Sequence, residues 1–125
     1  MISLLGVMAA SLAKALNPLK MLWMMVLTIV HLMNIKKIII HHMAATWTAK
    51  RCAESFADPN RKASATYCIG MDGEIVRCLD ENITPGTSGG YEADKDAVTI
   101  EVANSKMGEP WTVSDKSLNS LIALC

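Results

Sequence analysis

Two consecutive histidines, His41 and His42, follow three isoleucines (38–40) at the end of a predicted strand. A strand holds its backbone in place, so an imidazole at its end is aimed, which suits a metal ligand. Because successive side chains alternate between the faces of a strand, the two histidines are expected to point in opposite directions. A hydrogen-bonded structural histidine is the alternative for each. The remaining histidine, His31, lies in an apolar run without a visible partner, and we interpret it as incidental.

A single carboxylate, Glu101, interrupts the apolar segment 97–103 (AVTIEVA), which also predicts a strand. An ionised carboxylate in a largely buried strand is costly unless it is paired. Glu101 therefore lies either on a solvated face or in a functional site. The preceding residues, 80–95, form a long polar segment, and loops of this length inside a compact domain are often functional.

The elements that must position these side chains follow from local patterns. Residues 35–41 predict a central strand that is buried on both faces, because their apolar run is almost continuous. A helix is expected over about 47–57, capped by Thr46 or Thr48. A second helix begins after Ser114, which is a suitable N-cap, and carries an apolar stripe.

Asp72-Gly73 separates two apolar runs and predicts a hairpin. This dipeptide is favoured in a two-residue type I′ turn. That turn would place Tyr67 opposite Cys78, and Cys68 opposite Arg77. The two cysteines would then point to opposite faces, so we expect no disulfide between them.

The composition limits the function classes. With 125 residues the chain has room for one domain, and its 12 basic and 12 acidic residues give no net charge. No basic patch indicates a nucleic-acid partner. The four cysteines form no CxxC pair, so we expect a reducing compartment rather than a disulfide scaffold.

Residues 1–33 form an apolar extension ahead of the domain predicted for 34–125. Its second apolar run, 21–32, is shorter than the roughly 20 residues that span a bilayer, and no basic segment precedes the first run as in a secretory signal. An interfacial or marginal membrane helix and a buried helical hairpin are two interpretations. An upstream extension outside the domain proper is the third, and the ordinary strand-first start at 33–37 favours it.

Four segments in order resemble the zinc-dependent N-acetylmuramoyl-L-alanine amidases of the amidase_2 and peptidoglycan-recognition type. They are IIIHHMAAT (38–46), TYCIGMDGEIVRCLDE (66–81), AVTIEVAN (97–104) and SDKSLNSLIALC (114–125). Their order and spacing look like those of phage endolysins. The resemblance implies an α/β fold in which helices flank a central mixed sheet, with the apolar N-terminal helical segment added. The strands are expected near 35–42, 65–71, 74–79 and 97–103, and the helices near 47–57 and 114–125.

The resemblance also implies a reaction and a site. The family hydrolyses the amide between N-acetylmuramic acid and L-alanine of the peptide stem, with zinc held by two histidines and a cysteine or aspartate. Zinc lowers the pKa of bound water to about 7 and acts as a Lewis acid. By position, His41 matches the first metal ligand. Tyr67 matches a tyrosine that donates to the developing oxyanion, and Glu101 a glutamate that handles the proton of the water or orients a ligand.

The chain departs from the family in two places. Many members carry a Trp-His-Ala-Gly segment where residues 83–90 contain neither histidine nor tryptophan. The two remaining ligands of the family lie beyond the helix that begins near Ser114, and the sequence ends at Cys125. We therefore expect the N-terminal portion of an amidase-like domain, incomplete at its C-terminus, with an exposed sheet edge that favours self-association.

Three function classes follow. The first is a peptidoglycan hydrolase for host lysis, cytoplasmic until lysis or associated with the cell wall. The second is a catalytically inactive fragment that binds cell-wall muropeptide. The third is a small membrane-associated protein that contacts the membrane through residues 2–32.

Overall fold

The structure, a computed structural model, describes residues 18–20, 22–23, 25–26 and 34–125. The chain divides into two units, Met1–Asn34 and Ile35–Cys125. In the first unit, the described residues 18–20, 22–23 and 25–26 are helical. His31 and the first apolar run lie outside the described residues, and the boundary at residue 33 stays a prediction. Within the described part, no helix is long and apolar enough to cross a membrane.

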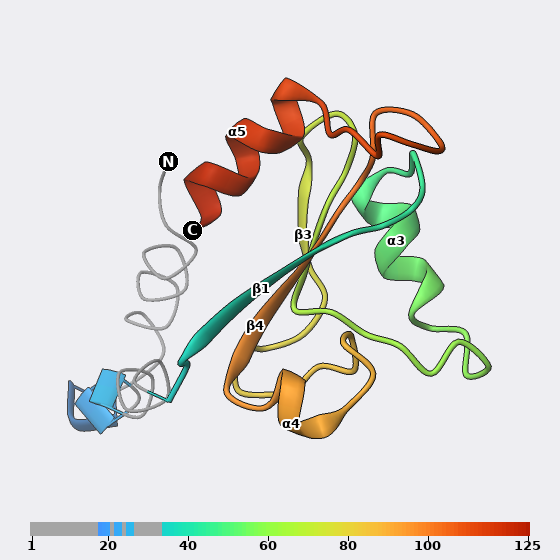
Figure 1. The fold of residues 1–125 in the computed structure, drawn as a ribbon. Coiled ribbons are helices and arrows are strands. Elements are labelled where there is room, and N and C mark those ends of the chain that lie inside the picture. The colour runs from blue at the N-terminus through green and yellow to red at the C-terminus, as the bar shows by residue number, and fades with distance from the viewer. Residues whose placement is uncertain (1–17, 21, 24, 27–33) are drawn as a thin grey trace. The chain divides into compact units, whose positions relative to one another are not determined.

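The second unit contains four strands and three helices among its described residues (Figure 1). In chain order they are β1 (Lys37–His42), α3 (Ala49–Ser55), β2 (Tyr67–Ile69), β3 (Ile75–Arg77), α4 (Tyr91–Asp94), β4 (Ala97–Val102) and α5 (Asp115–Leu124).

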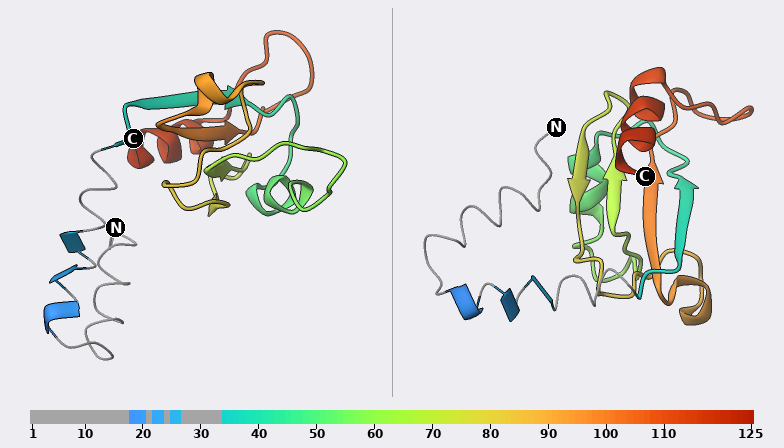
Figure 2. Two further views of the ribbon diagram at one scale, coloured as in Figure 1. Left: turned by 90° about the horizontal axis from the view of Figure 1, so that it is seen from below. Right: turned by 90° about the vertical axis from the view of Figure 1, so that its left-hand side faces the viewer.

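The strands form one mixed sheet in the order β1-β4-β2-β3. Strands β1, β4 and β2 run parallel, and β3 pairs antiparallel with β2. Helices α3 and α5 lie on opposite sides of this sheet (Figure 2). We call these sides the α3 face and the α5 face. The predicted α/β fold, a mixed sheet flanked by helices, is confirmed.

Each face of the sheet has its own apolar core. On the α3 face, Ala49, Cys52 and Cys68 are buried and pack with partly buried neighbours that include Trp47 and Phe56. On the α5 face, the buried residues are Ile69, Ile100 and Val102, and Leu121 and Leu124 of α5 pack against them. Side-chain alternation along the strands explains this division, because Cys68 and Ile69 are successive residues of β2.

In the sheet formed by the described residues, β1 is an edge strand, so the prediction of a central strand buried on both faces was wrong. Ile38 and Ile40 are 52% and 54% exposed, whereas Ile39 and His41 are half-buried on the α3 face. A continuous apolar run is consistent with two covered faces but does not require them.

The hairpin turn also differs from the prediction. Gly73 N donates to Gly70 O (2.9 Å) and Gly70 N donates to Glu74 O (2.9 Å), which closes a three-residue loop. Gly73 has a φ of 87°, and Asp72 does not have a positive φ. This arrangement is a turn followed by a left-handed glycine rather than a type I′ turn. The register therefore shifts by one residue, and Tyr67 pairs with Arg77.

The same turn contacts both helices. Met71 N donates to Trp47 O just before α3 (3.2 Å). On the other face, hydroxyls of α5 and its N-cap bond to the turn carbonyls: Ser114 to Met71 (2.8 Å), Ser117 to Gly70 (2.8 Å) and Ser120 to Gly73 (2.6 Å). A Cβ at Gly70 would lie 2.6 Å from the backbone nitrogen of Ala49, so this close approach requires glycine.

Both major helices begin at the N-caps expected from the sequence. Thr48 is the N-cap of α3 and accepts a hydrogen bond from Arg51 N at 3.1 Å. Ser114 is the N-cap of α5 and accepts one from Ser117 N at 3.1 Å. These bonds satisfy backbone donors that the first turn of a helix leaves unpaired.

Candidate functional site

His41 and Glu101 are neighbours on the α3 face. His41 of β1 is the register partner of Glu101 of β4, and Cys68 of β2 is the next residue in the same row. Adjacent strands lie about 4.8 Å apart, and register partners in a parallel pair direct their side chains to the same face. The structure therefore brings together two of the three site residues that the sequence predicted.

The His41 imidazole is held by the loop between β3 and α4. Its Nε2 lies 3.0 Å from the hydroxyl of Ser88. Ser88 is itself fixed by Asp94, because its backbone N–H donates to Oδ1 (3.1 Å) and Oδ2 (2.9 Å) of that carboxylate. Thr87 N donates to the same Oδ2 at 2.9 Å. Asp94 is only 1% exposed, so a buried carboxylate orders the loop that faces His41.

A second set of contacts fastens this loop to the sheet. The hydroxyl of Thr87 donates to Ser64 O at 2.5 Å and lies 2.8 Å from the hydroxyl of Thr99. Thr99 precedes Glu101 by two residues on β4 and so shares its face. Ser88 was not a candidate from the sequence. The only signal for it was the long polar segment 80–95.

The two carboxylates of this region have opposite pKa shifts. Burial raises the pKa of Glu101, and the nearby charges of His41 and Arg61 offset this only in part. Burial alone would also raise the pKa of Asp94, but the N–H donors of Ser88 and Thr87 outweigh it and lower that pKa. Asp94 is therefore the ionised structural anion, and Glu101 is the carboxyl group that takes up a proton more readily.

Arginine and aromatic side chains gather on the α3 face, where the positive charge of Arg61 also acts on Glu101. The guanidinium of Arg51 lies 4.9 Å from the centroid of the Trp47 ring. Arg61 lies 5.8 Å from the same ring and 5.4 Å from the ring of Phe56. Cation–π contacts of this kind hold an arginine in place while its N–H groups stay available for an anionic or peptide ligand.

Tyr67 and His42 lie on the other face of the sheet. Tyr67 pairs with Ile100, the residue before Glu101, and therefore points to the α5 face. Its hydroxyl donates to Glu81, and burial together with this carboxylate raises the pKa of the phenol. The structure does not bring Tyr67 to His41. His42 points away from His41 as expected, with its Nδ1 3.3 Å from Asn104 Oδ1.

The resemblance implies a bound zinc, and the described side chains show whether the ligands for it are present. His41 is a suitable ligand by its chemistry, but a catalytic zinc needs about three protein ligands. Among the residues that the structure describes, no three side chains of the histidine, cysteine, aspartate or glutamate type converge to hold a metal ion. The described residues therefore do not fit a complete zinc site.

Comparison with known proteins identifies the family. Residues 31–125 match the family Amidase_2, described as N-acetylmuramoyl-L-alanine amidase. The chain belongs to this family. No curated protein sequence matches the chain.

Two solved structures share the fold. One is PGRP-SA of Apis mellifera, with 20% sequence identity and a TM-score of 0.52. The matched region covers 73% of this chain and 59% of the PGRP-SA chain. The other is human PGRP-IβC in complex with glycosamyl muramyl pentapeptide, with 23% identity and a TM-score of 0.53, covering 73% and 60%. This chain thus spans about 60% of the length of these proteins. Family membership supports a function related to peptidoglycan, either hydrolysis or binding.

Proposed function

We propose that this domain binds muropeptide, the peptide-bearing unit of peptidoglycan, at the His41–Glu101 site. The observation that carries the proposal is the pairing of His41 with Glu101 on the α3 face, beside a loop that buried Asp94 holds in place. Family membership supports the ligand class. The complex of human PGRP-IβC with a muramyl pentapeptide is consistent with it.

The polar groups of the site suit a peptide stem. The Ser88 hydroxyl and the His41 imidazole can donate to and accept from the amides of the stem. The guanidinium of Arg61, supported by Trp47, is suited to the carboxylates of the stem. Because Glu101 is half-buried, a bound peptide would shield it further from water.

Calorimetric titration with a muramyl pentapeptide tests this proposal. Replacing His41 by alanine or Glu101 by glutamine should each raise the dissociation constant about tenfold, equivalent to about 1.4 kcal/mol. Lys50→Ala is the control, because Lys50 is an exposed residue of α3 that makes only a surface ion pair with Glu54 (3.8 Å). Binding by both site variants at wild-type strength, with unchanged melting temperatures, would exclude the site.

Hydrolysis of the amide between N-acetylmuramic acid and L-alanine is the second candidate. The raised pKa of Glu101 beside His41 favours it, because a carboxyl group that titrates closer to neutral pH can serve as a general acid or base. If zinc takes part, His41 is the ligand that we propose among the described residues. The test measures the zinc content of the purified chain together with release of stem peptide from muropeptides. One zinc per chain with release supports an enzyme, and tight binding without release supports recognition alone.

The biological setting is part of the proposal. The resemblance to endolysins suggests a phage product that stays cytoplasmic until host lysis and then acts at the cell wall. Contact of residues 2–32 with a membrane and self-association through the β1 edge are further proposals. Partition of the full chain between detergent and aqueous phases tests the first, and sedimentation at increasing concentration tests the second. Deletion of residues 1–32 is the matched control for both.

A further inference from the structure

Three of the four cysteines lie together on the α3 face, and one of them, Cys68, is the register partner of Glu101 on the neighbouring strand. Cys52 is on α3, Cys68 is on β2 and Cys78 directly follows β3. All are free thiols. Cys52 and Cys68 belong to one buried cluster, and Cys78 packs against it. The sulfurs of Cys68 and Cys78 are 3.5 Å apart.

The observed register produces this contact. Cys68 pairs with Val76, and Cys78 N donates to Thr66 O at 2.8 Å. Cys68 and Cys78 are therefore diagonal neighbours on the same face of adjacent strands, where side chains can touch. The register expected from the sequence placed the two side chains on opposite faces of the hairpin, and that placement was wrong.

We propose that Cys68 and Cys78 form a reversible dithiol–disulfide site, oxidised by small-molecule disulfides such as oxidised glutathione. The sulfurs must approach from 3.5 Å to the bond length of about 2.05 Å. Adjustment of side-chain dihedral angles in two already paired strands can supply most of this movement. The site does not depend on the function proposed above.

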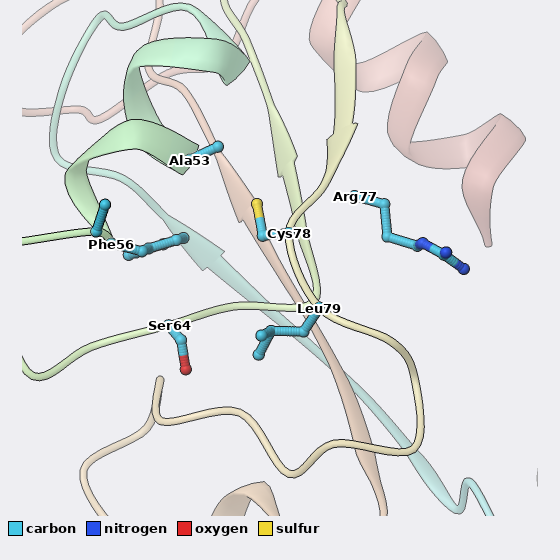
Figure 3. A pocket seen from close by; sticks show the side chains of 7 residues that line it. Ala53, Phe56, Ser64, Arg77, Cys78 and Leu79 are labelled. Carbon is cyan, nitrogen blue, oxygen red and sulfur yellow. The ribbon is translucent and has the colours of Figure 1, made fainter.

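Cys78 is the thiol that a dissolved disulfide can reach. It is partly exposed, whereas Cys52 and Cys68 are 1% and 0% exposed. Cys78 lines a hollow of about 430 Å³ (Figure 3). The hydrogen bond with Cys68 lowers the pKa of the Cys78 thiol. Hydrogen bonds of the Cys68 thiol with Cys52 and Cys78, together with burial, raise the pKa of Cys68. Cys78 is thus the attacking thiol and Cys68 the resolving one.

The exchange proceeds in two balanced steps. The Cys78 thiolate attacks one sulfur of oxidised glutathione, breaks its S–S bond and expels one glutathione thiolate, which leaves a mixed disulfide on Cys78. Cys68 then loses its proton, attacks the Cys78 sulfur and expels the second glutathione thiolate. The two protein thiols are oxidised by two electrons, and their two protons end on the two released glutathione thiols.

The test equilibrates the full chain in glutathione redox buffers, followed by acid quenching, alkylation and peptide mapping. It is performed in a Cys125→Ser background, because Cys125 is exposed and could cross-link two chains. We expect the protein to lose two hydrogens and two alkylation sites. A peptide linking Cys68 to Cys78 should appear, while Cys52 remains alkylated. A higher melting temperature of the oxidised form should accompany this, since the bond constrains the unfolded chain.

Three results would overturn the proposal. They are a bridge between Cys52 and Cys68, a mixed disulfide on Cys78 that never resolves, and full alkylation of all three thiols under oxidising conditions. Two variants serve as a matched pair. Cys78→Ser should take up no glutathione, and Cys52→Ala should retain the bridge. If a variant fails to fold, peptide mapping of the chain with all three thiols present still shows whether the Cys68–Cys78 disulfide forms.

Discussion

Replacing Asp94 by asparagine tests whether a buried carboxylate orders the loop that faces His41. The Asp94 carboxylate accepts N–H bonds from Thr87 and Ser88 at 2.9–3.1 Å and is 1% exposed. Asparagine keeps one acceptor oxygen but turns an NH₂ group toward the same donors. One buried N–H is then unpaired, which costs about 1–3 kcal/mol, and the remaining bonds lose their charge.

We therefore expect Asp94→Asn to lower the free energy of unfolding by about 2–3 kcal/mol. For a unit of this size, that loss corresponds to a fall in melting temperature of about 10–20 °C. The assay is urea unfolding with the midpoint and slope fitted together. Asp96→Asn is the control. Its carboxylate makes a partly exposed ion pair with Lys36 at 3.2 Å, so it should change the free energy by less than about 0.5 kcal/mol.

The stabilisation that the Asp94 carboxylate provides depends on pH, because the pKa of this group is lowered in the folded protein. Its pKa in the unfolded chain is about 3.9, and in the folded protein it is lower. The stabilisation is thus present above the unfolded value and is lost as the pH falls through the folded value. The difference in the free energy of unfolding between wild type and Asp94→Asn should therefore become smaller in that acidic range. A variant that unfolds at the same urea concentration as wild type at neutral pH would refute the role of the carboxylate.

Three further outcomes are expected. Gly70→Ala should lower the free energy of unfolding by about 1–3 kcal/mol, because the added Cβ meets the backbone nitrogen of Ala49 at 2.6 Å. Gly86→Ala is the control in urea unfolding and should be nearly neutral, because the nearest atom to its added Cβ is 3.7 Å away. Ser88→Ala removes the partner of His41 Nε2; the muropeptide dissociation constant should rise about threefold to tenfold, and a histidine Nε2 resonance should shift in the ¹⁵N spectrum. Ser114→Ala removes the N-cap of α5 and should destabilise the unit by about 1–2 kcal/mol in thermal unfolding.

Sequence reasoning identified His41 and Glu101 separately as candidate site residues, because each stood out in its own strand. Their positions as register partners on parallel strands could not be derived from local pattern, since register between strands distant in sequence depends on the whole sheet. The resemblance to a known family supplied the link. Ser88 lies 47 positions from His41, and no local signal distinguishes it from the other hydroxyls of its loop.

The hairpin shows why a short-range rule can fail. Asp72-Gly73 is favoured in a type I′ turn, yet here Asp72 instead accepts a hydrogen bond from Glu74 N at 3.0 Å, and only Gly73 has a positive φ. The turn gains one residue, and a one-residue slip exchanges the faces of every side chain. For this reason the contact between Cys68 and Cys78 could not be foreseen.

Strand β1 illustrates a different limit. The isoleucines of β1 indicate side chains that favour an apolar environment. They do not indicate whether the rest of the described chain covers both faces of the strand. Ile39 is half-buried on the α3 face, whereas Ile38 and Ile40 are more than half exposed. Hydrophobic patterning thus identified the strand correctly and misplaced it within the sheet.

The hairpin turn also sets how this unit can move. Its backbone binds the segment before α3 on one face and three serine hydroxyls at α5 on the other. Opening of the turn would break these bonds to the segment before α3 and to α5, so we expect the two layers to move together rather than to hinge about the sheet. Amide protons at Gly70, Met71 and Gly73 should consequently exchange with solvent only through global unfolding, at the slowest rates of the unit.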